Sequence, residues 1–252
     1  MSEATLTLRI VANDGVELVA DIWNPTGTPT LLLLPAGGEV RNVWRKVVAN
    51  LTTDVMQRWR IIAADHRGHG DSGRSPAYRF AHLFDDLQCW IRALSAKPLV
   101  VGGGSIGGAL ALVAAGEGAC IDGVVLLDVP TVPVLEKALG ERRRMIGARV
   151  TDHPAMRSVD PNFTRSGFIE DVFQDADRWR RAAVSLRAPI LLIGGETGAI
   201  GPMQLEQYRE HAPHGEFARL ATGHLVARDD PEGVARLLSG FLAAHFGRSD
   251  AA

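Results

Sequence analysis

The sequence predicts an α/β fold with a parallel sheet at its centre. Several short runs are apolar at almost every position and are separated by stretches of helical periodicity, namely residues 30–34, 60–64, 99–101, 124–127 and 189–193. Runs of this kind are typical of strands that are buried on both faces, as in a parallel sheet covered by helices. Ahead of them, residues 5–11 and 16–23 alternate apolar and polar side chains around an Asn-Asp-Gly turn, which predicts a hairpin.

The helical pattern is clearest over residues 80–94. There the apolar residues recur at intervals of three and four, which places them on one face of a helix: Phe80, Leu83, Phe84, Leu87, Ile91 and Leu94. A second helix is expected after Ser105. A third is expected to begin near Pro231, because proline is favoured in the first turn of a helix.

The composition is that of a globular protein with a nearly balanced charge. The chain has 252 residues, 46% of them hydrophobic, and a formal net charge of −2, so neither nucleic acid nor a membrane is an expected partner. The one dense basic run, Arg142–Arg144, is interpreted as a solvated helix face. The first residues lack the features of a signal peptide, which favours a cytoplasmic location. Cys89 and Cys120 lie in apolar stretches without metal or redox spacing, and we expect both to be small core residues.

A glycine-rich corner surrounds Ser105 in the stretch LVVGGGSIGGAL, residues 99–110. Two kinds of site have this pattern. In the first, Gly103 and Gly107 give the space for a serine held exposed on a sharp strand-to-helix turn. In the second, Gly102, Gly104 and Gly107 form the G-x-G-x-x-G of a dinucleotide site, with Asp128 near the expected ribose-binding position.

The segments around this corner favour the exposed serine. LLLLPAGG at 31–38, ADHRGHGDS at 64–72, the corner itself and ATGHL at 221–225 follow one another as they do in the α/β-hydrolase family, which the chain resembles over residues 5–246. The resemblance implies an eight-stranded, mostly parallel sheet flanked by helices, whose first two strands form the hairpin. It also implies a helical cap inserted after strand six, at 131–187, with residues 1–130 and 188–252 as the core.

The nucleophile and its base are assigned to Ser105 and His224. A serine hydroxyl needs a base to remove its proton, and histidine is suited to that task at neutral pH. His224 lies in a Gly-His turn after a short strand pattern, where the family's histidine lies; the alternative is an ordinary loop histidine. His66 and His69 resemble a structural turn of the family. The other histidines are interpreted as surface or cap residues: His82, His153, His211, His214 and His245.

Two backbone amides are expected to form an oxyanion hole. Ile106 follows the serine and supplies one from the start of its helix. By its position in the family, Gly37 supplies the other, the alternative being a plain loop turn. Relatives commonly have His-Gly where this chain has Pro35-Ala36, which leaves the choice between neighbouring residues open.

The acid of the triad is the one component missing from its usual place. Most relatives carry an aspartate after strand seven, where this chain has Gly198. Some carry it after strand six instead, which favours Asp128. The alternatives are Glu196, a cap acid such as Asp152, or no acid at all.

The sequence therefore predicts a serine hydrolase that needs no cofactor and no metal. Its small-molecule substrate is expected to be a carboxylic ester, lactone or thioester, cleaved through an acyl-enzyme on Ser105. A cofactor-free lyase, isomerase or cyclase, a non-catalytic small-molecule receptor and a dinucleotide-dependent oxidoreductase are the alternatives. The oligomeric state is left open.

Overall fold

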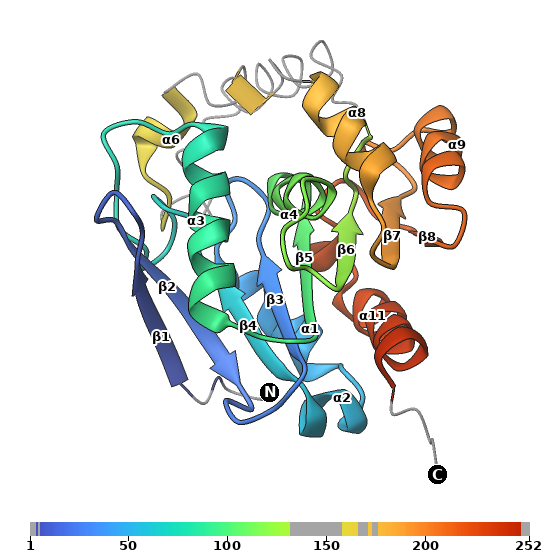
Figure 1. The fold of residues 1–252 in the computed structure, drawn as a ribbon, viewed down its shortest axis with the longest axis horizontal. Helices are drawn as coiled ribbons and strands as arrows, with labels where there is room; N and C mark the ends of the chain where they lie inside the picture. Colours follow the sequence, from blue (N-terminus) through green and yellow to red (C-terminus); the bar gives the residue numbers. More distant parts are fainter. Residues whose placement is uncertain (1–3, 5, 132–157, 166–170, 173–175, 248–252) are drawn as a thin grey trace.

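The protein is represented by a computed structural model that describes residues 4, 6–131, 158–165, 171–172 and 176–247. These residues form an eight-stranded sheet in the order β1-β2-β4-β3-β5-β6-β7-β8 (Figure 1). The strands are β1 (Leu6–Val11), β2 (Glu17–Trp23), β3 (Thr30–Leu34), β4 (Arg60–Ala64), β5 (Leu99–Gly104), β6 (Gly123–Leu127), β7 (Ile190–Gly195) and β8 (Glu216–Leu220). Strand β2 is antiparallel to both of its neighbours, whereas the pairs from β4 to β8 are parallel. The predicted mostly parallel sheet is thus confirmed.

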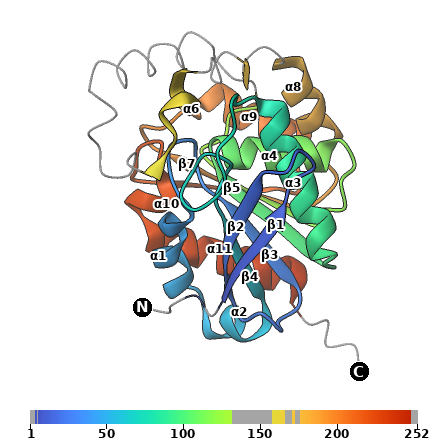
Figure 2. The ribbon, with the colours of Figure 1, turned by 90° about the vertical axis from the view of Figure 1, so that its left-hand side faces the viewer.

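Helices cover both faces of the sheet. On one face lie α3 (Phe80–Leu94), α4 (Ile106–Gly116), α8 (Ala176–Ser185) and α9 (Pro202–His211). On the other lie α1 (Trp44–Ala49), α2 (Thr53–Arg58), α10 (Val226–Asp229) and α11 (Pro231–Phe246). A 3₁₀ turn, η1 (Arg41–Val43), precedes α1. The two views show α3 and α4 on the opposite side of the sheet from α1 and α11 (Figures 1 and 2).

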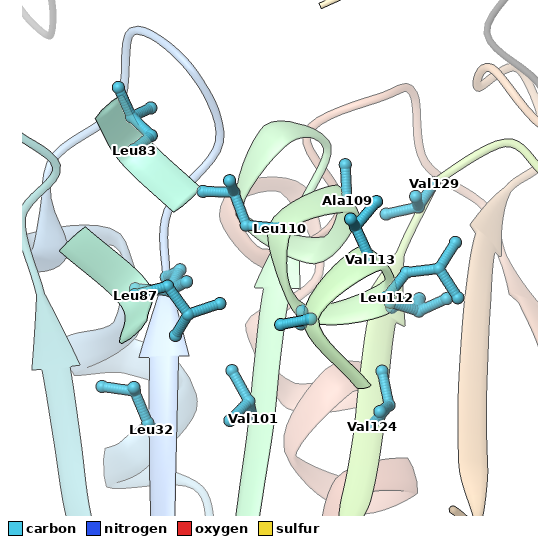
Figure 3. Close-up of a cluster of buried hydrophobic side chains, with 14 of the residues drawn as sticks. Leu32, Leu83, Leu87, Val101, Ala109, Leu110, Leu112, Val113, Val124 and Val129 are labelled. Atoms are coloured by element: carbon cyan, nitrogen blue, oxygen red, sulfur yellow. The ribbon is translucent and has the colours of Figure 1, made fainter. Parts of the chain in front are cut away.

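The larger part of the core lies between the sheet and helices α3 and α4. Strand residues Leu32, Val101 and Val124 meet Leu87 of α3 and Leu110 of α4 there (Figure 3). Helix α4 is buried almost along its whole length, which explains why its sequence is apolar on all sides rather than on one stripe. A rigid, buried helix therefore begins directly after Ser105.

Local sequence explains where the last helix begins. The Asp230 carboxylate accepts a hydrogen bond from the Gly233 amide at 2.8 Å, and Pro231 occupies the first turn. Both are common signals for the start of a helix. The expected start near Pro231 is confirmed.

The predicted cap lies mostly outside the described residues. This holds for Arg142–Arg144, for His153 and for the candidate acid Asp152, so the boundaries 131–187 stay a prediction. The described parts of that span include α6 (Pro161–Arg165) and α8. Among the helices that the structure describes, none combines the length and apolar character required to cross a membrane.

One expectation about the cysteines is wrong. Cys89 is buried in α3, as predicted, but Cys120 is exposed. It lies in the loop between α4 and β6, after the last turn of the buried helix. Gly116, Glu117 and Gly118 separate it from the apolar residues of α4, so its apolar neighbours in the sequence do not place it in the core.

Candidate active site

The predicted site residues come from the ends of five strands on one edge of the sheet. Gly37 follows β3, Ser105 follows β5, Asp128 follows β6, Gly198 follows β7 and His224 follows β8. Because these strands are parallel, their carboxyl ends share one edge, which is where open α/β sheets bind ligands. Residues far apart in the sequence can therefore meet there.

Ser105 sits on a strained corner between β5 and α4. Its φ of +46° lies in the left-handed region, which residues other than glycine seldom adopt. A Cβ on Gly103 would lie 2.4 Å from the carbonyl carbon of Gly107, and a Cβ on Gly107 would lie 2.6 Å from the Leu34 carbonyl oxygen. The glycines two before and two after the serine are thus required for space, as the exposed-serine interpretation predicts.

Three side chains form an unbroken series of hydrogen bonds at this edge. His224 Nε2 lies 2.9 Å from Ser105 Oγ, and His224 Nδ1 lies 2.7 Å from Asp128 Oδ2. An ionised carboxylate can only accept, so Nδ1 donates to Asp128 and Nε2 is left to accept from the serine hydroxyl. The Asp128 side chain is fully buried, whereas that of His224 is 32% exposed. The imidazole is therefore oriented from inside the protein and open toward the serine.

The Asp128 carboxylate is held by backbone amides as well as by the histidine. The Gly195 amide donates to Oδ1 at 3.1 Å, the Ile200 amide donates to Oδ1 at 3.4 Å, and the Ala199 amide donates to Oδ2. Burial alone would raise the pKa of the Asp128 carboxyl, but the hydrogen bonds from His224 and these amides outweigh it and hold the pKa below its ordinary value. Asp128 is therefore ionised at neutral pH.

The other candidate acids are not found beside the histidine. Glu196 is exposed, and within the described part of the chain no hydrogen bond joins its carboxylate to His224. Asp152 lies outside the described residues. Of the acids weighed from the sequence, Asp128 is the one that the structure brings to His224.

The amides of Gly37 and Ile106 belong to residues that lie side by side at this edge of the sheet. Within the described residues, neither amide donates a hydrogen bond, whereas the neighbouring Gly38 amide donates to His69 Nε2 at 3.2 Å. A Cβ on Gly37 would lie 3.5 Å from the Ile106 side chain, so the two residues are adjacent. Of the two glycines, Gly38 thus has an amide that is already used, whereas the Gly37 amide has no such partner within the described residues.

His66 and His69 brace the loop that carries Gly37, a contact that sequence reasoning missed. His66 Nε2 donates to the Pro35 carbonyl oxygen at 2.8 Å, and His69 Nδ1 donates to the Arg67 carbonyl oxygen at 3.0 Å, which leaves its Nε2 to accept from Gly38. Burial lowers the pKa of His66 to about 4 and that of His69 to about 3. Both rings are thus neutral supports. The sequence located their turn but carried no signal for these partners.

Comparisons with known proteins agree with this arrangement. Residues 29–148 match the family model described as alpha/beta hydrolase fold. The solved structure of a thermophilic esterase from Thermogutta terrifontis is 22% identical, with a TM-score of 0.75 over 96% of this chain and 100% of that one. A haloalkane dehalogenase from Bradyrhizobium elkani is 19% identical, with a TM-score of 0.77 over 96% of this chain and 98% of that one.

The chain has the α/β-hydrolase fold. Among curated proteins, a proline iminopeptidase of Pestalotiopsis fici is 32% identical over 107 residues. That match covers 41% of this chain and 37% of the relative, so this chain spans little more than a third of the relative's length.

One described part of the span 131–187, which was predicted as the cap, lies close to the candidate active site. The Phe163 ring lies against His69, with ring centroids 4.4 Å apart and planes at 82°, and a Cβ on Gly37 would lie 3.8 Å from Phe163 Cε1. Tyr78 Oη donates to the Asp160 carboxylate at 2.7 Å, which ties the start of α6 to the core. Phe163 belongs to the span 131–187 that was predicted as the cap. The structure places its ring beside Gly37, which gives this side of the candidate site an apolar surface.

Proposed function

We propose that this α/β hydrolase is a serine hydrolase that cleaves a carboxylic ester, lactone or thioester. The observation that supports it most strongly is the unbroken series from Ser105 Oγ through His224 to Asp128, at 2.9 and 2.7 Å. These distances are short enough for proton transfer from the hydroxyl to the imidazole as the serine attacks.

In the proposed reaction, Ser105 Oγ attacks the carbonyl carbon while His224 Nε2 takes the hydroxyl proton. The tetrahedral intermediate breaks its bond to the leaving oxygen or sulfur, which receives that proton as the alcohol or thiol departs. Water then attacks the acyl-enzyme, giving its proton to His224, and the acid is released as Ser105 regains its hydrogen. Asp128 keeps Nδ1 protonated and stabilises the imidazolium throughout.

The Gly37 and Ile106 amides would donate hydrogen bonds to the carbonyl oxygen as negative charge develops on it. Ile106 directly follows Ser105, Gly37 lies beside the Ile106 side chain, and within the described residues neither amide donates a hydrogen bond. A preorganised donor in such a site contributes about 2.7 to 4 kcal/mol to transition-state stabilisation. Because the donors belong to the backbone, Pro35 and Ala36 can replace the usual His-Gly without removing them.

The hydrogen bond between His224 and the Asp128 carboxylate also weakens the argument for a non-hydrolytic reaction. The glycine at position 198 favoured a lyase, isomerase or cyclase because the triad then lacked an acid at its usual place. Asp128 supplies a buried carboxylate that accepts from His224. The same contact occupies the aspartate that a dinucleotide site would use for a ribose.

A fluorophosphonate probe tests whether Ser105 is an activated nucleophile. We expect prompt labelling of the wild-type chain and of Ser185→Ala, which changes an exposed serine at the end of α8, and no labelling of Ser105→Ala. Mass spectrometry of the labelled peptide locates the adduct. Absence of wild-type labelling, or labelling that persists in Ser105→Ala, would contradict the proposal.

A substrate panel then separates the reaction classes. p-Nitrophenyl esters, simple lactones and acyl thioesters are incubated with wild-type protein and Ser105→Ala, and the acid and alcohol or thiol products are quantified. Turnover that is lost in Ser105→Ala supports hydrolysis and shows which bond is preferred. Labelled Ser105 without turnover of any panel member would favour the receptor or a non-hydrolytic reaction.

A further inference from the structure

His69 is a fully buried histidine that supports the loop containing Gly37. Its Nε2 accepts from the Gly38 amide at 3.2 Å, and its Nδ1 donates to the Arg67 carbonyl oxygen at 3.0 Å. An imidazole nitrogen can accept a hydrogen bond only while it carries no proton. His69 therefore holds the Gly38 amide in its neutral form and would release it on protonation.

Phe163 covers this imidazole from one side. Its ring meets that of His69 edge to face, with centroids 4.4 Å apart, and is itself only 5% exposed, so the two rings shield each other from water. Among the described residues, His66 and Asp160 are the titratable groups that face His69. Burial and His66 lower the pKa of His69 to about 3, which the backbone hydrogen bond and the Asp160 carboxylate offset only in part.

Backbone pairing joins residues 158–160 to the loop 68–70. His69 lies opposite Val159 in an antiparallel bridge, which is flanked by two backbone hydrogen bonds of 2.7 Å between the two segments. The backbone of His69 and that of the residues just before Phe163 are thus fixed to one another.

The Tyr78 side chain adds a second attachment. Its hydroxyl donates to the Asp160 carboxylate at 2.7 Å, and its ring centroid lies 5.5 Å from that of Phe163. A Cβ on Gly68 would lie 2.5 Å from Tyr78 Cε1, so the tyrosine ring lies directly on the loop backbone. Tyr78 is fully buried and is not one of the candidate site residues, so a change there acts on the site through its neighbours.

We propose that Phe163 is a positioning residue, whose ring keeps water from His69 so that this imidazole continues to accept from the Gly38 amide. That hydrogen bond in turn fixes the neighbouring Gly37 amide, the expected oxyanion donor. Tyr78 holds the segment that carries Phe163. The effect on turnover rests on the proposed function, whereas the effect on the Gly38 amide is measured without a substrate.

Hydrogen exchange of the Gly38 amide tests the shielding directly. Its protection factor is measured by NMR at pH 7.5 and at pH 5, in the wild type and in Phe163→Ala. Without the ring, water reaches His69 and its pKa returns toward the ordinary 6.5, so the imidazole is protonated at pH 5 and no longer accepts. Relative to the wild type, we expect protection in Phe163→Ala to fall by about 5 to 10-fold more at pH 5 than at pH 7.5. Unchanged protection, or a loss that is independent of pH, would overturn the proposal.

Two further variants separate shielding from a general loss of stability. Phe163→Leu keeps an apolar side chain over the imidazole and should retain most of the protection at both pH values. Phe246→Ala removes a ring that packs edge-on against Trp59 on the other face of the sheet, so it should leave the pH dependence of Gly38 protection as in the wild type. The same pH-dependent loss in Phe246→Ala as in Phe163→Ala would overturn the proposal.

Tyr78→Phe tests the consequence for catalysis and keeps the inference testable if Phe163→Ala does not fold. The substitution retains the ring and removes the hydroxyl that contacts Asp160 and the Ser75 amide. We expect weaker Gly38 protection and a fall in kcat for the best ester by about 2 to 10-fold with little change in KM, because a less firmly placed donor is weaker in the transition state. Both effects should disappear in a His69→Leu background, in which the Gly38 amide has already lost its acceptor.

The outcomes of this cycle are distinct from those of the proposed function. Equal effects of Tyr78→Phe in both backgrounds, or a change confined to KM, would overturn the path through His69. If the wild type turned over no ester, the proposed function would fail, while the exchange of the Gly38 amide would still decide whether Phe163 shields His69.

Discussion

Two loops at the same edge of the sheet carry backbone amides that can bind an anion, but only one of them binds an anionic side chain in the described structure. Residues 35–38, after β3, leave the Gly37 amide without a partner among the described residues. Residues 196–200, after β7, direct the amides of Ala199 and Ile200 onto the permanent charge of Asp128. In the proposed reaction, the first would bind an anion that exists only transiently, whereas the second already binds the Asp128 carboxylate.

This difference explains how each loop is kept in shape. The charge of Asp128 organises the loop after β7 from within, because amides and carboxylate attract one another. The loop after β3 has no resident charge and is braced from outside by His66 on the Pro35 carbonyl and by His69 on the Gly38 amide. Because the Gly37 amide has no hydrogen-bond partner of its own in the described structure, contacts elsewhere in the loop must fix its position.

The largest expected effect comes from neutralising the resident charge. Asp128→Asn keeps the shape of the side chain but favours the wrong imidazole tautomer, and we expect kcat for the best ester of the panel to fall by about 10³ to 10⁴-fold. Steady-state kinetics on the folded variant measure this. Glu196→Gln, which removes an exposed carboxylate from the same loop, should leave kcat unchanged. Wild-type turnover in Asp128→Asn would show that another group serves as the acid.

A smaller effect is expected from removing an external support. His69→Leu takes away the acceptor of the Gly38 amide and frees the loop that carries Gly37. Because a misplaced donor is a weaker donor in the transition state, kcat should fall by about 10 to 100-fold with little change in KM. His214→Ala, at an exposed histidine, serves as the control. A decrease confined to KM would place His69 in substrate binding rather than in support of the loop.

The smallest expected effect is on the free energy of unfolding, whose pH dependence differs between the groups that stabilise the two loops. In the folded protein His66 and His69 have pKa values of about 4 and about 3, below the ordinary 6.5, so between these values the unfolded chain binds protons that the folded chain does not. The free energy of unfolding should therefore fall as pH drops below about 6.5, by about 1.4 kcal/mol per pH unit for each histidine.

The Asp128 carboxylate, which the loop after β7 binds, affects the free energy of unfolding at lower pH. The pKa of Asp128 lies below its ordinary value, so its contribution is present above about pH 3.9 and is lost only as pH falls further. Urea titrations between pH 7 and pH 4.5 include the contribution of both histidines, and His66→Gln should reduce the slope relative to the wild type. An unchanged slope in that variant would mean that other groups titrate in this range.

The sequence allowed much of this arrangement to be predicted because its signals are local. Apolar runs gave the strands, three- and four-residue spacing gave the helix Phe80–Leu94 with the bounds the structure has, and crowded glycines marked the corner at Ser105. Each of these patterns reports on the conformation of its own segment. The order of the segments in the sheet came from the resemblance to a family.

What escaped prediction depends on contacts between distant segments. The difference between the Gly37 and Gly38 amides follows from His69 and could not be read from a glycine pair. The choice of Asp128 over Glu196 follows from which carboxylate meets His224, about a hundred residues away. Cys120 was misplaced because apolar neighbours in the sequence do not by themselves place a residue in the core.

The attachment points of the span between β6 and β7 suggest a practical use. The chain leaves the sheet after Asp128, touches the core near Phe163 and returns through α8, which packs so closely on α4 that a Cβ on Gly116 would lie 2.4 Å from the Ala182 carbonyl oxygen. The three residues joined by the hydrogen bonds of the candidate site, Ser105, His224 and Asp128, all lie outside that span. Segments from other proteins of this fold could therefore be exchanged between these anchors without replacing any of the three residues, which makes the scaffold suitable for modular redesign.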